Sequence, residues 1–97
     1  MKVETWYKLS FREQLSNIAG EVKRLIDNEE ENDKQYEEFY LNKIKELINI
    51  TFTDPKNDIR RKEEVLGEYD SILRYIKGEF DSDYILRYWE QYSLANS

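Results

Sequence analysis

The sequence predicts an all-α fold: a small antiparallel helical bundle of three long helices plus a short C-terminal helix, in a single domain over residues 1–97. Apolar residues recur every three or four positions through most of the chain, as they do on the buried side of amphipathic helices. One proline and three glycines leave few points at which a helix must end. Aromatic residues make up 14%, which is more than a disordered chain normally carries.

The first long helix is expected at about residues 10–28. Ser10 can cap its free N–H groups, and Glu13 can reach back to complete a capping box. The helix then carries one apolar row, which consists of Phe11, Leu15, Ile18, Val22 and Ile26. Residues 1–9 are too apolar for a free tail, so we expect them to pack across one end of the bundle.

Residues 27–38 form an acidic corner between the first two helices. They hold seven acids against one base, Lys34, and so carry a net charge of -6, equal to that of the whole chain. The corner lacks the spacing of an EF-hand loop, so a solvated helix junction is favoured over a Ca²⁺ or Mg²⁺ site. Asn32 or Asp33 is expected to cap the second helix, which runs to about residue 51. Its buried row would be Tyr36, Tyr40, Ile44, Leu47, Ile48 and Thr51.

The stretch TFTDPKNDIRRKEE, residues 51–64, is either a phosphate- or nucleic-acid-binding loop or a corner between helices. Asp54 and Pro55 are a helix-start signal, a capping carboxylate followed by a residue already near helical φ. The third helix would then end at Gly78, with its buried row formed by Ile59, Leu66, Tyr69, Leu73 and Ile76. The bases Arg60, Arg61 and Lys62 fall off this row, within reach of the acids Glu63, Glu64 and Glu68. The corner interpretation is therefore favoured.

The short fourth helix begins near Asp81 or Ser82 and frays by Ala95. Tyr, Trp and Arg are enriched at protein interfaces, and this helix is rich in all three. The candidate interface residues are Tyr84, Arg87, Tyr88, Trp89 and Tyr92. Two alternatives remain open: the helix covers the bundle core, or its rings stack on single-stranded RNA, an option that the acidic net charge disfavours.

In the first helix, EQLSNIAGE places Gln14 and Asn17 beside the apolar row, and Gly20 permits the close approach of another backbone. These residues could form a polar groove for a ligand. A polar rim beside a helix crossing at Ala19 and Gly20 is the favoured interpretation, because small residues inside a helix usually have a packing reason.

The chain contains no histidine and no cysteine. The commonest general base, most zinc and iron sites, thiol nucleophiles and disulfides are thereby excluded. No catalytic, metal-binding or cofactor-binding residue is expected, and no cofactor. No apolar run approaches the roughly 18 residues of a membrane span, and the first residues lack the apolar region of a signal peptide. A cytoplasmic location without membrane contact is therefore expected.

The sequence resembles a group of short, uncharacterised prokaryotic proteins through pieces spread over nearly the whole chain. These pieces are WYKLS (6–10), EQLSNI (13–18), TDP (53–55), KEEVLGEYD (62–70) and YILRYWEQY (84–92). The resemblance implies an all-helical fold and no particular activity. In architecture alone, the chain is also similar to helical bundles of the HEPN type. The active members of that type use an Arg-x4–6-His motif to cleave RNA. Without histidine, that activity is not expected here.

Together these observations predict a non-enzymatic, cytoplasmic module for protein–protein contact that self-associates, most simply as a homodimer through the Tyr-rich end. Nucleic acid is not an expected partner. The alternative is a regulatory or antitoxin-like protein whose acidic corner docks on a basic surface, for example that of a nucleic-acid enzyme.

Overall fold

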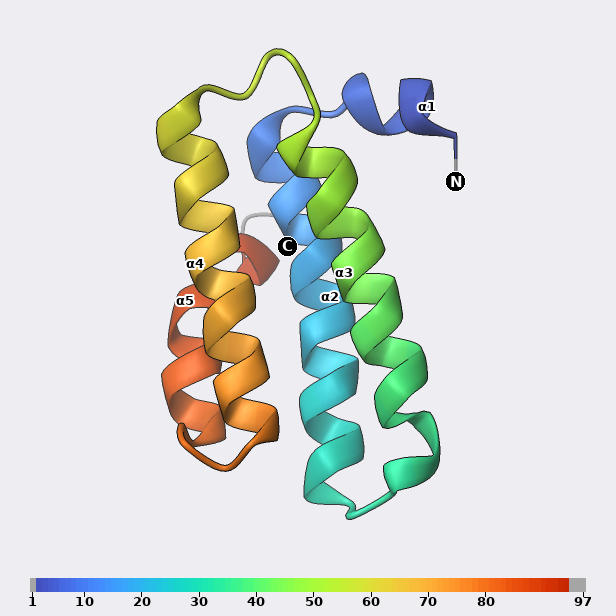
Figure 1. Ribbon diagram of the computed structural model, residues 1–97, viewed down its shortest axis with the longest axis vertical. Helices are drawn as coiled ribbons and strands as arrows, with labels where there is room; N and C mark the ends of the chain where they lie inside the picture. The colour runs from blue at the N-terminus through green and yellow to red at the C-terminus, as the bar shows by residue number, and fades with distance from the viewer. Residues whose placement is uncertain (1, 95–97) are drawn as a thin grey trace.

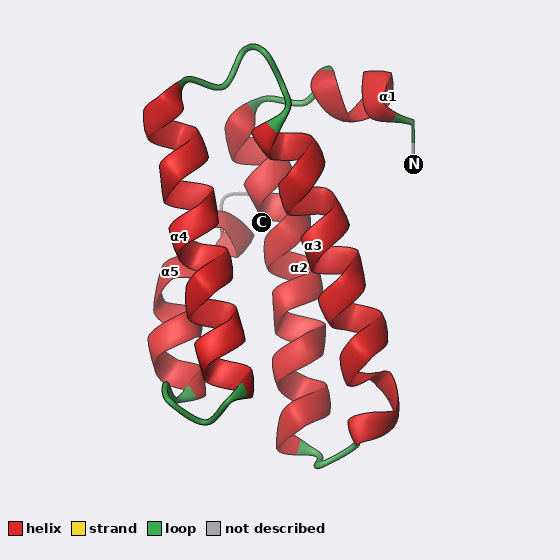
Figure 2. Ribbon diagram, viewed as in Figure 1, coloured by secondary structure: helices red, strands yellow, loops and turns green. Residues whose placement is uncertain are grey.

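The computed structural model describes residues 2–94, and within this range the secondary structure is helical and includes no strand (Figure 2). The helices are α1 (Val3–Tyr7), α2 (Phe11–Glu30), the 3₁₀ turn η1 (Lys34–Tyr36), α3 (Glu37–Phe52), α4 (Ile59–Ile76) and α5 (Ser82–Leu94). The predicted all-α fold class is thus confirmed. The additional helix α1 lies in the N-terminal segment, for which no helix was predicted.

The helices α2 to α5 enclose one hydrophobic core. Helix α2 packs against α3 and α5, and α4 packs against α3 and α5 in turn. Figure 1 shows that the chain turns back after α2, after α3 and after α4, and that α1 lies at the end of α3. The apolar row predicted for the first helix is confirmed from Leu15 to Ile26, because these side chains are at most 1% exposed. No helix of the described residues is long and apolar enough to cross a membrane.

Local capping signals set both ends of α2; the start is as predicted, while the end lies two residues beyond the predicted residue 28. The Ser10 hydroxyl accepts a hydrogen bond from the Glu13 N–H, while the Glu13 carboxylate accepts one from the Ser10 N–H, which completes the capping box. At the other end, Asn32 takes the left-handed conformation with a φ of 60° and stops the helix. Asp33 then caps η1 by accepting a hydrogen bond from the Gln35 N–H.

The predicted start of the third helix at Asp54 and Pro55 is wrong, because α4 begins only at Ile59. Its N-cap is Asp58, whose carboxylate accepts a hydrogen bond of 2.9 Å from the Arg61 N–H. The Asp54 carboxylate is directed elsewhere: it accepts hydrogen bonds from the protein interior and from the turn that follows it. Residues 53–58 therefore form a loop across the end of the bundle, which still agrees with the corner interpretation.

The buried side of α4 also differs from the predicted row. Val65 and Ile72 are fully buried, whereas Ile59 is 67% exposed and Leu66 is 44% exposed. Both rows have helical spacing, so the pattern alone permits either. Packing against α3 and α5 buries the row one residue earlier most deeply and leaves Ile59 and Leu66 at the edge of the helix, while Tyr69 and Ile76 of the predicted row are half-buried against the core. The helix ends as expected: Gly78 follows its C-cap with a φ of 82°.

Candidate interaction surface

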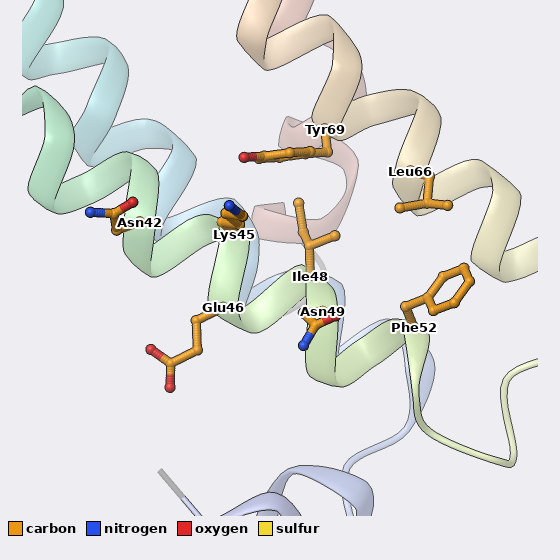
Figure 3. Close-up of a pocket in the computed structure, with 8 residues that line it drawn as sticks. All are labelled: Asn42, Lys45, Glu46, Ile48, Asn49, Phe52, Leu66 and Tyr69. Atoms are coloured by element: carbon orange, nitrogen blue, oxygen red, sulfur yellow. The ribbon is translucent and has the colours of Figure 1, made fainter.

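A groove open to solvent runs between α3 and α4, with a volume of about 630 Å³. Figure 3 shows Ile48 and Phe52 pointing from α3 toward Leu66 and Tyr69 of α4, so that these four side chains form its apolar floor. The polar part of its lining consists of Asn42, Lys45, Glu46 and Asn49. The groove resembles sites for small ligands or peptides both in its size and in its apolar lining.

The apolar surface continues beyond the groove in both directions. Phe39, 59% exposed, lines a neighbouring hollow of about 350 Å³ that shares Asn42 and Glu46 with the groove. On α4, Ile59 lies two helical turns before Leu66 on nearly the same side of the helix. Exposed apolar side chains that adjoin a groove are a common feature of interaction sites.

The basic cluster of residues 60–62 lies at the start of α4, beside this surface. Arg60 and Arg61 are exposed as predicted, while Lys62 is half-buried. The cations contact aromatic rings: the Arg61 guanidinium lies 5.3 Å from the ring centre of Phe11, and the Lys62 ammonium 5.5 Å from that of Phe52. The predicted pairing with the acids of the same helix does not occur among the described residues.

The five candidate interface residues of the Tyr-rich end fall into two groups. Trp89 is 1% exposed and Tyr92 is 8% exposed, and both belong to the hydrophobic core. Tyr84 is 54% exposed, Arg87 is exposed and Tyr88 is half-buried. This end therefore offers a partner mainly Tyr84 and Arg87, and a contact through them stays a prediction.

Tyr88 and Tyr92 of α5 both donate a hydrogen bond to one carboxylate of α4, that of Glu64. The Tyr88 hydroxyl donates a hydrogen bond of 2.7 Å to Oε2 of Glu64, and the Tyr92 hydroxyl donates one of 3.4 Å to the same oxygen. Burial, and then the neighbouring Tyr92 and Glu64, raise the pKa of Tyr88 far above that of a free tyrosine. Tyr88 therefore stays protonated at physiological pH and acts as a structural hydrogen-bond donor.

The acidic corner contains a bridged pair of carboxylates. The Lys34 ammonium contacts Oε2 of Glu29 at 2.8 Å and Oε2 of Glu37 at 3.1 Å. Burial, and then the Glu37 carboxyl, raise the pKa of Glu29, while hydrogen bonds with Glu29 and Lys34 lower that of Glu37. The Lys34 ammonium offsets the charge repulsion between these two carboxylates.

Of three further acids, Glu79 and Asp81 lie in the turn between α4 and α5, and Asp83 lies in the first turn of α5. They line a hollow of about 320 Å³ together with Phe80, Tyr84 and Arg87. Figure 1 shows this turn at the same end of the molecule as the acidic corner. The structure thus joins two acidic segments, far apart in the sequence, into one acidic end.

Gln14, expected at a polar rim, is fully buried. Its Nε2 donates to Oδ2 of Asp54 at 2.7 Å and to the Trp6 carbonyl at 3.0 Å, and its Oε1 accepts a hydrogen bond of 3.0 Å from Asn57. The Trp6 indole N–H in turn donates to Thr51 at 2.9 Å. These hydrogen bonds join α1, α2 and the loop before α4, so the rim interpretation is wrong for Gln14 and the cluster is a structural joint.

Among residues 2–94, no group of three or more carboxylates is arranged to hold a metal ion. The groove was missed by sequence analysis because Leu66 and Tyr69 were placed in the core. One signal could have revealed it: α4 carries more apolar residues than a single buried row requires.

A scan against models of protein families, a search among curated proteins and a search among solved structures each give no match to this chain. The resemblance to short prokaryotic helical proteins and to HEPN-type bundles is not tested by them.

Proposed function

We propose that this chain, a small antiparallel helical bundle, is a non-enzymatic, cytoplasmic module for protein–protein contact that self-associates as a homodimer. The observation that carries the proposal is the apolar groove between α3 and α4, with Leu66 and Phe39 exposed along it. Charged residues make up 37% of the chain, so an open apolar groove on its surface is unusual. A helix of a partner protein is the typical occupant of such a groove.

The polar groups around the groove support binding rather than catalysis. They are two amides, one lysine and one glutamate, and Figure 3 shows Glu46 pointing away from the apolar floor. No histidine or cysteine exists to serve as a base or a thiol nucleophile. A reaction site needs a nucleophile and a base in mutual reach, or donors that converge on one point.

Sedimentation equilibrium of the purified chain tests this proposal. At high micromolar concentration we expect about twice the chain mass of 11.9 kDa. An apolar contact should persist in about 0.5 M salt, because charge screening acts on electrostatic contacts only. A mass of 11.9 kDa throughout the concentration range would overturn self-association.

A second candidate function is a regulatory or antitoxin-like role in which the acidic end docks on a basic protein surface. Its support is that the turn between α4 and α5 and the start of α5, with Glu79, Asp81 and Asp83, lie at the same end of the molecule as the acidic corner. The test is binding of a Lys- and Arg-rich peptide, compared with a variant in which these three acids are amides. We expect salt-sensitive binding that weakens in the variant; binding unchanged by the amides would contradict this role.

A further inference from the structure

Helix α4 exposes a second apolar row besides the one that it buries. Ile59, Leu66 and Leu73 follow one another at intervals of seven residues, which brings them to nearly the same side of the helix. Ile59 and Leu66 are exposed and Leu73 is half-buried. The row that the core buries fully is the other one, with Val65 and Ile72. Apolar residues at this spacing are the pattern by which one helix packs lengthwise against another.

This row lies beside a groove that can receive it. Leu66 stands at the edge of the groove, next to Phe52 and Tyr69 (Figure 3). The same surface therefore presents an exposed leucine side chain and the apolar groove that it lines. A surface of this kind is complementary to itself, as the contact of a twofold dimer must be.

The charges on α4 favour an antiparallel pair of these helices. If two copies of α4 cross at Leu66, residues equally distant from Leu66 come to the same height on opposite helices. Lys62 and Asp70 each lie four residues from Leu66 and carry opposite charges, while Ile59 and Leu73 each lie seven residues away and are both apolar. A parallel pair would instead place each charge opposite its own copy, where it repels.

Gly67 adds an independent observation at the same place. It is exposed in the middle of α4, and a Cβ added there would meet nothing within 4 Å. A glycine inside a helix costs about 1 kcal/mol relative to alanine, and no contact within the chain requires one here. A second helix that passes close to the backbone beside Leu66 would supply the reason.

We propose that two copies of this chain pair through α4 in antiparallel orientation, with Leu66 at the twofold axis. The Leu66 side chain of each copy enters the groove of the other, and Lys62 of each copy faces Asp70 of the other. This inference rests on the proposed self-association and names its surface.

A single cysteine tests the position of the axis, since the chain itself has none. A residue on a twofold axis meets its own copy, and a disulfide requires Cα atoms within about 7 Å. Leu66→Cys should therefore give a disulfide-linked dimer under mild oxidation. Tyr84→Cys is the matched control, because Tyr84 is exposed to a similar extent on α5. We expect little cross-linking of this control.

Charge exchange tests the orientation. Lys62→Asp should weaken the dimer about tenfold, because two symmetric pairs of charges are lost, and adding Asp70→Lys should restore it. A wild-type chain that stays monomeric would overturn the proposed self-association itself. A wild-type dimer that does not cross-link at residue 66, or that cross-links at residue 84 instead, would overturn only this surface. A double variant as weak as Lys62→Asp would overturn the antiparallel orientation.

Discussion

Gln14 of α2 donates a hydrogen bond of 2.7 Å to the carboxylate of Asp54, forty residues further along the chain, and both side chains are buried. The same carboxylate accepts a hydrogen bond of 3.0 Å from the Lys56 N–H and pairs with the Lys56 ammonium. The Asn57 side chain donates a hydrogen bond of 3.0 Å to Oε1 of Gln14, so the polar atoms of both side chains are satisfied where α2 meets the loop before α4. This junction fixes the position of the loop against the bundle.

Asp54→Ala should lower the free energy of unfolding by about 2 kcal/mol, because it leaves one N–H of the buried Gln14 amide without an acceptor. Urea unfolding followed by fluorescence measures this directly, since Trp6 and Trp89 are both buried. Asp58→Ala is the control: it removes the N-cap of α4 and should cost about 1 kcal/mol. A loss at Asp54 no larger than at Asp58 would contradict the role of the junction.

The contribution of Asp54 should depend on pH in a defined direction. Burial alone would raise the pKa of Asp54, but hydrogen bonds from Lys56 and Gln14 outweigh it and hold the pKa below the ordinary value of 3.8. The carboxylate therefore stabilises the fold above about pH 4, and this stabilisation is lost as the pH falls through the folded-state pKa. The difference in unfolding free energy between the wild type and Asp54→Asn should be constant above about pH 5 and shrink below pH 4. A difference that persists in acid would exclude ionised Asp54 as its source.

These residues show which parts of the fold could be predicted from the sequence. The all-α class, the capping box at Ser10 and the helix stop at Gly78 depend on neighbours within a few positions, and the sequence displays them directly. The burial of Gln14 could not be predicted in the same way. Its partners Asp54 and Asn57 are about 40 residues away, so only the folded chain brings them together.

The groove could not be predicted for a related reason. Two apolar rows of helical spacing run along α4, and the rotation of that helix is decided by α3 and α5 rather than by its own sequence. Once Val65 and Ile72 face inward, Leu66 moves to the edge. In the Tyr-rich helix α5, packing instead buries Trp89, a residue predicted to lie at an interface, and leaves Tyr84 exposed.

Gly67→Ala and Gly78→Ala should change stability in opposite directions. At Gly67 the backbone is helical and the added Cβ meets nothing, so alanine should raise the free energy of unfolding by about 1 kcal/mol. At Gly78 the φ of 82° is strained for any residue with a Cβ, so alanine should lower it by about 1 kcal/mol. Thermal unfolding at low micromolar concentration compares the two. A destabilising Gly67→Ala in dilute solution would mean that the chain itself requires this glycine.

Val65→Ala and Leu66→Ala, at adjacent positions of α4, provide the most direct test of which row faces the core. Val65 is fully buried, so its truncation leaves a cavity and should cost about 2 kcal/mol of unfolding free energy. Leu66 is 44% exposed, so its truncation should cost at most about 1 kcal/mol in dilute solution. Urea unfolding measures both variants under identical conditions. Sedimentation equilibrium at high concentration should then show a weakened dimer for Leu66→Ala and an unchanged dimer for Val65→Ala, because only Leu66→Ala removes a proposed dimer contact. A larger loss at Leu66 than at Val65 in dilute solution would place the exposed row in the core and remove the basis for the dimer.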